Sequence, residues 1–389
     1  MKARVCICLI SVLSASVPLE AQEREAARPD AKARFLSVLD SQFLEWDADA
    51  DGVLSVREID ARVADGNVKA EAASAAAALK RASRMKKLAL PDFTKEHLVE
   101  LAGRTATKEW PGLPEMFSGG LSRIENARRV LFASGRPRLE TVHQGRMGNC
   151  FSLAPLGALA FHRPDFIVKE MIRERPDGRF DVTLGKQTVC VSAPTDAELA
   201  MTATNESDGF WVNVYEKAAG EARNDLKPEN ERAATGLDAL SRGGSAGTML
   251  AFITGHEMVR FSCKFARDPK TTPEIFEQKL AELRTALIGA VKEKRLMTCG
   301  TTTTNIPGVT PNHAYAVLGY DPSCDTIRCW NPHGTTTSFK GEPGPAKGYP
   351  MTDGIFEMPL PVFVKEFSGL AFEVLPLSGT KPAGQSETR

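Results

Sequence analysis

A cysteine lies between a glycine-rich turn and an apolar run in the segment Gln144-Gly145-Arg146-Met147-Gly148-Asn149-Cys150-Phe151-Ser152-Leu153-Ala154. This pattern predicts that a helix begins at Cys150. The positive end of a helix, together with a nearby histidine, lowers the pKa of a thiol and favours the nucleophilic thiolate. Gln144 is the candidate amide donor to the oxyanion that forms when a thiolate attacks a carbonyl group, alongside the backbone N–H of Cys150. A lone cysteine is more commonly a buried apolar thiol, so the assignment depends on the residues that accompany it.

A predicted hairpin further along the chain supplies a histidine and an asparagine. Residues 314–320 and 326–330 have the composition of two strands, and residues 321–325 that of a turn. The midpoint of positions 313 and 331 falls inside this turn. His313 and Asn331 are therefore expected to face each other at the open end of the hairpin, give or take one register step. Asn331 can then hold the imidazole while His313 exchanges a proton with Cys150, which is a Cys-His-Asn triad.

These segments resemble the catalytic core of the calpain family of cysteine proteases, and the resemblance covers about residues 138–375. It implies an α+β, papain-like fold of two subdomains, in which Gln144 serves the oxyanion hole, Cys150 is the nucleophile, His313 is the base and Asn331 orients the base. Further landmarks occur in the family's order: Phe210-Trp211 before Glu216-Lys217-Ala218, the run 240–253 around Gly243-Gly244-Ser245, and the segment 353–358 with Phe363 and Phe367.

The chain also departs from the family pattern near the cysteine and the asparagine. The family usually has Asp and Trp beside the cysteine and Asn-Pro-Trp-Gly after the second strand, whereas this chain has Asn149, Phe151 and His333. No member of the triad is lost, and these changes are expected to reshape the cleft. The calcium loops of the family's protease core do not carry over residue by residue.

An acidic loop near the N-terminus, residues 47–58, satisfies the EF-hand pattern for calcium. Calcium prefers about six to eight hard oxygen ligands, and Gly52 permits the sharp turn that lets them converge. The following helix pair offers a partner of the same shape, but its linking residues 83–87 are basic, which predicts a degenerate hand without metal. The predicted calcium ligands are Asp47, Asp49, Asp51, the carbonyl of Val53, Ser55 through water, and Glu58.

The first residues have the pattern of an export signal, with Lys2 and Arg4 before an apolar run from Val5 to Val17. The run is shorter than the roughly 20 apolar residues of a transmembrane helix, which favours a cleaved signal over an anchor. The predicted location is therefore outside the cytoplasm, either secreted or periplasmic. No membrane span is expected after the signal is removed.

The length of 389 residues predicts two or three compact units at roughly 100 to 200 residues each. The predicted division is a signal peptide (1–21), an all-α EF-hand-like unit (22–105), a catalytic domain (106–378) and a disordered tail (379–389). Within the catalytic domain, about 106–250 carries the cysteine and 251–378 carries the histidine and the asparagine.

Charge and cysteine usage exclude other classes of protein. The 49 basic residues balance the 49 acidic residues, and no local basic patch is evident in the sequence, so no nucleic-acid partner is predicted. Six of the eight cysteines follow the signal at irregular spacing, which is neither a disulfide scaffold nor a zinc pattern. A Cys324–Cys329 disulfide is a minority option.

The predicted function is an exported calpain-like cysteine endopeptidase that acts on a protein or peptide substrate and binds Ca²⁺ at its N-terminal loop. One alternative is a catalytically silent relative that acts as a calcium-dependent binding protein. A second alternative keeps the chemistry and transfers the acyl group to another acceptor. The sequence leaves open the cleavage preference, the role of calcium in catalysis and the oligomeric state.

Overall fold

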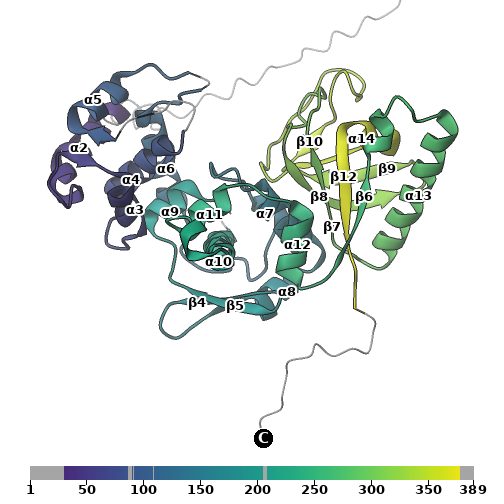
Figure 1. Cartoon of the computed structure of the whole chain (residues 1–389), viewed down its shortest axis with the longest axis horizontal. Coiled ribbons are helices and arrows are strands. Elements are labelled where there is room, and N and C mark those ends of the chain that lie inside the picture. Colours follow the sequence, from purple (N-terminus) through teal and green to yellow (C-terminus); the bar gives the residue numbers. More distant parts are fainter. Residues whose placement is uncertain (1–29, 86–89, 91, 108, 205–207, 377–389) are drawn as a thin grey trace, which may run out of the picture.

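A computed structural model describes residues 30–85, 90, 92–107, 109–204 and 208–376. Its fold is mixed α/β, with a helical unit, a central helical region that carries a small sheet, and a lobe built on a larger sheet (Figure 1). The predicted signal peptide and C-terminal tail lie outside the described residues. No helix in the described ranges combines the length and apolar character needed to cross a bilayer.

The helical unit contains two helix pairs joined by a two-stranded sheet. The antiparallel pairs Val53↔Thr94 and Leu54↔Phe93 connect the acidic loop to the second helix pair. Leu54 therefore pairs directly with Phe93 of the second helix pair. The elements are α2 (Ala31–Trp46), β1 (Val53–Leu54), α3 (Val56–Ala64), α4 (Ala70–Ser83), β2 (Phe93–Thr94), α5 (Lys95–Gly103) and α6 (Leu113–Asn126).

Helix α5 begins at Lys95 because the hydroxyl of Thr94 accepts a hydrogen bond from the backbone N–H of His97 and caps the helix.

One hydrophobic core runs through the helical unit and beyond position 105. It joins Phe35 and Leu39 of α2 to Phe117 of α6, and it also includes Ala197 and Met201 of α9 (Asp196–Met201). The packing of the helical unit thus reaches into the segment expected to belong to the catalytic domain.

The central region surrounds helix α7 (Cys150–His162), which begins at the residue that the sequence predicted. Residues 151–160 of α7 are all buried, as expected for a helix that is apolar on every side. A Cβ atom at Gly157 would lie 2.3 Å from the ring of Trp330, so glycine lets the helix approach the large sheet closely. The surrounding elements are η2 (Leu139–Thr141), α8 (Pro164–Phe166), η3 (Ile167–Met171), β3 (Ile172–Glu174), β4 (Phe180–Leu184), β5 (Gln187–Val191), α10 (Trp211–Asp225), η5 (Glu229–Glu231), α11 (Gly236–Ser241) and α12 (Ala246–Thr254).

Helix α10 ends shortly before Pro228. It begins at Trp211 and stops at Asp225, and Pro228 precedes a separate short turn. Proline lacks the N–H that a continuing helix requires, which accounts for this end of the helix.

The second lobe is built on a seven-stranded antiparallel sheet in the order β10-β11-β9-β8-β7-β12-β6. Strand β12 begins at Phe367 and runs between β6 and β7. The elements are β6 (Met258–Ser262), η6 (Lys264–Arg267), α13 (Pro273–Lys292), β7 (Met297–Thr301), β8 (Ala314–Asp321), β9 (Thr326–Trp330), β10 (Met351–Thr352), β11 (Ile355–Pro359), α14 (Leu360–Glu366) and β12 (Phe367–Glu373).

The hairpin of β8 and β9 forms as predicted, but its register differs from the predicted register. Ala316 pairs with Trp330 and Val317 pairs with Cys329, so an extension of the ladder would set position 313 opposite 333. The prediction that His313 directly opposes Asn331 is therefore wrong by two positions. The turn closes at Asp321↔Thr326, and a bulge between Val317 and Gly319 adds a residue to β8. The turn displaces the pairing from the symmetric midpoint, and the bulge reverses part of that displacement, which leaves the net shift of two positions.

Candidate active site

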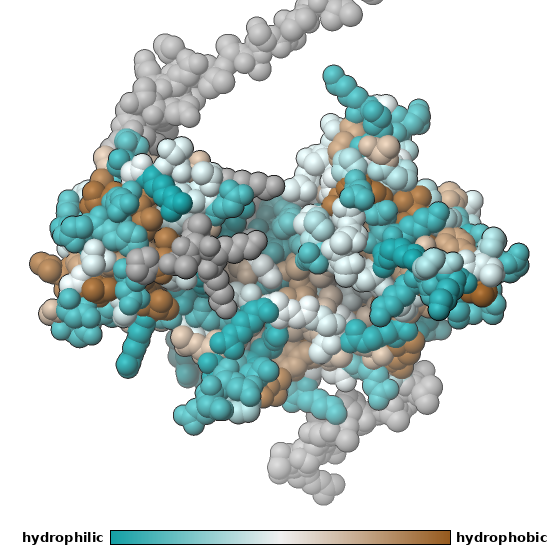
Figure 2. All heavy atoms as spheres, turned by 45° about the horizontal axis from the view of Figure 1, so that its top comes forward, coloured by the Kyte–Doolittle hydropathy of each residue, from teal (hydrophilic) through white to brown (hydrophobic). Residues whose placement is uncertain are grey.

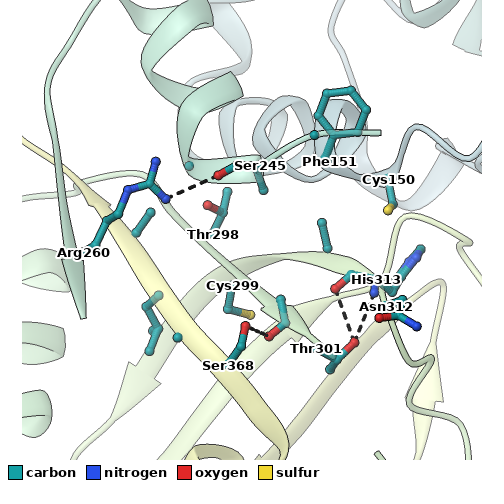
Figure 3. A pocket seen from close by; sticks show the side chains of 18 of the residues that line it. Cys150, Phe151, Ser245, Arg260, Thr298, Cys299, Thr301, Asn312, His313 and Ser368 are labelled. Atoms are coloured by element: carbon teal, nitrogen blue, oxygen red, sulfur yellow. Dashed lines mark hydrogen bonds between the residues drawn. The ribbon is translucent and has the colours of Figure 1, made fainter. Parts of the chain in front are cut away.

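A cavity of about 530 Å³ lies between the start of α7, the loop 243–247 and strands β7, β8 and β12. Cys150 and His313 both line it and reach into it from different lobes (Figure 3). On the face shown in Figure 2, the surface is hollowed between the sheet lobe and the rest of the molecule. The structure thus brings together two side chains that are far apart in the sequence.

The Cys150 thiol sits at the first residue of α7, half-buried beneath the cavity. Burial raises its pKa, although backbone hydrogen bonds from Ala314, Phe151 and Cys150 itself oppose this effect. The expected lowering of the thiol pKa by the helix terminus is therefore wrong for this structure, because desolvation outweighs it. No hydrogen bond joins the thiol to the His313 ring within the described part of the chain.

The ring of His313 is oriented by Asn331. The Nε2 atom of His313 lies 2.8 Å from the Oδ1 atom of Asn331, which also accepts a hydrogen bond of 3.0 Å from the backbone N–H of His333. Since Oδ1 is the acceptor in both contacts, Nε2 carries the proton of the neutral ring. The lone pair then lies on Nδ1, which is free to accept a proton.

Burial lowers the pKa of His313 to about 4, and the nearby His333 contributes to the shift while the Asn331 hydrogen bond opposes it. The two histidine rings stack with their centroids 4.3 Å apart. This stack follows from the observed register, which sets position 333 rather than 331 across from His313. A raised thiol pKa and a lowered imidazole pKa both favour a neutral pair, so the thiol keeps its proton until a reaction removes it.

The backbone around His313 is held by the end of β7. The hydroxyl of Thr301 accepts a hydrogen bond of 3.2 Å from the His313 N–H, and the Thr301 N–H donates to the His313 carbonyl at 2.9 Å. His313 is thereby fixed one residue before β8 begins.

Gln144 lies beside the asparagine segment but does not line the cavity. Its backbone N–H donates a hydrogen bond of 2.7 Å to the carbonyl of Pro332. Its side-chain Oε1 is buried and has no hydrogen-bond partner within the described ranges. The structure thus places Gln144 next to the segment that carries Asn331, but not in the lining of the cavity.

A buried carboxylate behind the cysteine was not found by sequence reasoning. The Oε1 atom of Glu216 accepts a hydrogen bond of 2.6 Å from the side chain of Asn149, and its Oε2 atom accepts one of 2.8 Å from the backbone N–H of Ala203. Burial raises the pKa of Glu216 to about 7, although these hydrogen bonds oppose the shift. The signal was available, because Glu216 follows Val212 by four residues and precedes Ala219 by three, on the buried face of α10.

The predicted calcium loop lies between α2 and α3, in the helical unit. Carboxylate oxygens of Asp47, Asp49 and Glu58 lie within 4.8 Å of one another, which is the convergence that a cation needs. Gly52 adopts a φ of 82°, as the sharp turn requires. Although partial burial opposes the shift, hydrogen bonds from Ser55, Ala48 and Asp49 lower the pKa of Glu58 and keep it ionised.

The remaining predicted ligands of the loop are close to this cluster. Asp51 donates its backbone N–H to Asp47 at 3.1 Å, and its carboxylate accepts the backbone N–H of Val53 at 2.8 Å. Ser55 and Glu58 form a reciprocal cap at the start of α3. The loop therefore has the shape and the donor set that hard cations prefer.

All six cysteines in the described ranges are free thiols. The minority option of a Cys324–Cys329 disulfide is not realised in this structure, in which Cys329 is buried and Cys324 is exposed.

Comparison with known protein families gives one match. The sequence profile of the calpain family cysteine proteases matches residues 119–344. No curated protein matches the chain. The matched residues make up more than half of the chain and include Cys150, His313 and Asn331. This chain belongs to the calpain family of cysteine proteases.

Proposed function

We propose that this protein is an exported cysteine endopeptidase that hydrolyses peptide bonds through Cys150, His313 and Asn331. One observation carries the proposal: the thiol of Cys150 and the ring of His313 share a cavity, and Asn331 leaves the lone pair of that ring on Nδ1. The two-lobed arrangement, with the cysteine on a buried helix and the histidine directly before β8, the central strand of the large sheet, supports a papain-like site.

Acylation starts from the neutral pair. Nδ1 of His313 takes the thiol proton as Sγ attacks the substrate carbonyl carbon, so that a C–S bond forms and the carbonyl oxygen becomes an oxyanion. The backbone N–H of Cys150 is one donor to this oxyanion, and Gln144 is the candidate second donor once its side chain turns toward the cavity. Collapse breaks the C–N bond, and the departing amine takes the proton from His313.

Deacylation repeats these steps with water as the nucleophile. His313 takes a proton from water, the resulting hydroxide attacks the thioester, and the C–S bond breaks to release a carboxylic acid. The proton held by His313 returns to Sγ and restores the thiol. Asn331 takes part only by holding the imidazole, so it is a positioning residue.

The loop 47–58 is proposed to bind calcium as an EF-hand, with the degenerate second hand packed against it. The carboxylate cluster of Asp47, Asp49 and Glu58 and the positive φ of Gly52 support this fit. The ligands would be these three carboxylates, Asp51, the Val53 carbonyl and Ser55. Calcium would supply charge compensation that holds α2 and α3 together, and no step of peptide hydrolysis passes through it.

The test is hydrolysis of unfolded casein by the full chain, with and without calcium. We expect the wild-type protein to cleave casein, and Cys150→Ala and His313→Ala to abolish cleavage. A peptide that carries an electrophile should label Cys150, whereas a small alkylating agent alone does not separate a protease from a silent relative.

Two results would contradict the proposal. Full casein cleavage by the Cys150→Ala variant would remove the thiol from the mechanism. Transfer of the acyl group to an added amine, with no hydrolysis in its absence, would identify a transferase.

A further inference from the structure

A second cavity, of about 690 Å³, adjoins the candidate active site. It lies between helices α3 and α4 of the helical unit, residues 146–148 of the loop that leads to Cys150, and helix α11. Gly148 lines both this cavity and the one that contains Cys150 and His313. Ser241 and Arg242 line the second cavity and Gly243 and Gly244 line the first, so the two share a wall as well.

The second cavity has an excess of positive charge. Five basic residues line it, and two carboxylates, Asp60 and Asp238, face them. Both carboxylates are already engaged, because Lys80 bonds to each of them and Arg84 bonds to Asp238 at 2.5 Å. The basic residues that line the cavity are Lys80, Arg81, Arg84, Arg146 and Arg242.

Among the residues that the structure describes, two of the guanidinium groups that line this cavity, those of Arg81 and Arg146, have no carboxylate partner. The nearby Arg123, in contrast, is attracted by Glu216. Within the described ranges, neither Arg81 nor Arg146 forms an ion pair, and the side chain of Arg123 bonds only to the carbonyl of Ala200. Burial lowers the pKa of Arg81 to about 10, and repulsion by Arg146 and Arg123 adds to this shift. Like charges in a partly desolvated site repel strongly, so an anion placed among them would relieve an existing unfavourable interaction.

We propose that this cavity is a substrate subsite that binds the carboxylate of an Asp or Glu residue near the scissile bond. The assignment rests on the proposed peptidase function and adds a substrate preference to it. Arg81 and Arg146 are the primary ligands, since a guanidinium fork donates two parallel hydrogen bonds to a carboxylate. The occupant is a peptide side chain because Gly148 lines both this cavity and the one in which a bound peptide must meet Cys150.

The test uses the full chain with the Cys150→Ala substitution, so that peptides bind without being cleaved. The probes are fluorescein-labelled decapeptides of Gly, Ala and Leu in which a single Asp is moved through each position, with an Asn peptide matched to each. We expect an Asp peptide to bind roughly tenfold more tightly than its Asn partner at one or two positions. The preference should weaken as salt is raised.

Variants at the two arginines connect the preference to the cavity. Arg81→Gln with Arg146→Gln should remove the difference between the Asp and Asn peptides. Arg136→Gln removes one positive charge from an exposed loop that lines neither cavity and should leave the difference intact, as the control for a simple loss of charge. If the glutamine variant does not fold, Arg81→Lys with Arg146→Lys keeps the charge, loses the fork and should reduce the preference severalfold.

Equal affinity of the Asp and Asn peptides at every position, including no detectable binding of either, would overturn the assignment. An Asp preference that survives in both arginine variants would do the same. The result also separates this inference from the peptidase function. Casein cleavage without an Asp preference would remove the subsite alone, and an Asp preference in a protein that cleaves nothing would remove the peptidase alone.

Discussion

Replacing Glu216 by Gln should make the fold more stable at alkaline pH. Glu216 is fully buried on α10, and its pKa is raised to about 7 by burial from an ordinary value of 4.5. An acid with a raised pKa binds its proton more tightly in the folded state than in the unfolded state. Its stabilising contribution is therefore present below about pH 4.5 and is lost as the pH rises through about 7.

The size of the loss follows from the two pKa values. The interval from 4.5 to about 7 corresponds to about 3 kcal/mol of folding free energy, at about 1.4 kcal/mol for each unit of pKa. Glutamine has no proton to lose and can accept the Ala203 N–H through Oε1. Its Nε2 group can donate to Asn149 after that amide turns, since the Asn149 Oδ1 is buried without a partner within the described part of the chain. The substitution should therefore cost little at low pH.

The assay is thermal unfolding of the full chain from pH 4.5 to pH 8.5, followed by tryptophan fluorescence, because Trp211 is buried on the same helix. At pH 4.5 the two proteins should unfold at similar temperatures. At pH 8 Glu216→Gln should unfold roughly 6 °C higher, at about 2 °C for each kcal/mol. Glu140→Gln, the same change at an exposed position, is the matched control.

A difference in unfolding temperature that does not change with pH would refute the reasoning. So would a Glu216→Gln variant that is less stable than the wild-type protein at pH 8. Either result would mean that Glu216 is ionised in the folded protein across this range and is stabilised by its two hydrogen bonds.

Four further outcomes are expected. Asn331→Ala should lower kcat for casein by roughly tenfold to a hundredfold while leaving measurable activity, because the residue orients the base without bonding to substrate; loss of all activity would assign it a more direct role. His333→Ala should raise the pKa of His313 and move the acid limb of kcat/KM to higher pH, since burial and His333 both lower that pKa; an unchanged limb in the His333→Ala variant would contradict this electrostatic argument. Glu58→Gln should abolish calcium binding, measured by titration calorimetry, and lower the melting temperature by several degrees, while casein cleavage at about 20 to 25 °C changes little. A calcium affinity equal to that of the wild-type protein would show that the loop is not the calcium site. Mass mapping under non-reducing conditions should find Cys150 unpaired, and a stable disulfide through it would point to redox control.

Local patterns in the sequence predicted the residues that act through short stretches of chain. The helix start at Cys150 follows from a glycine-rich turn before an apolar run, and the carboxylate convergence of Asp47, Asp49 and Glu58 follows from spacing within one loop. In both cases the relevant geometry is set by neighbours in the chain. Contacts with distant parts of the chain have little influence on this local geometry.

The pairing of His313 was predicted correctly in outcome and wrongly in detail. The contact with Asn331 forms at 2.8 Å, yet the ladder register is shifted by two positions. A bulge and an asymmetric turn are not encoded by strand composition, so symmetry about a midpoint has no physical basis there. The stacking of His333 on His313 depends on that register and therefore could not be predicted from the sequence.

The basic cavity illustrates the other limit of sequence reasoning. No local basic patch was evident in the sequence, and the 49 basic residues balance the 49 acidic residues. The arginines that repel one another come from three separate segments: Arg81 from α4, Arg123 from α6 and Arg146 from the loop that leads to Cys150. Only the tertiary fold brings these three side chains close together. Charge balance along the chain does not constrain charge balance inside a cavity.

The contacts of the helical unit indicate that it supports the catalytic region rather than standing apart from it. The ammonium group of Lys80 is buried between Asp60 of α3 and Asp238 of α11, and Arg84 also bonds to Asp238. Removing one partner from a buried ion cluster leaves an uncompensated charge and costs about 3 to 5 kcal/mol. Asp60 follows Glu58 by two residues on the same helix, so calcium at the loop would stabilise the helix that anchors this cluster. Since the cluster also forms a wall of the basic cavity, the acidic loop and the proposed substrate subsite are linked through one short helix.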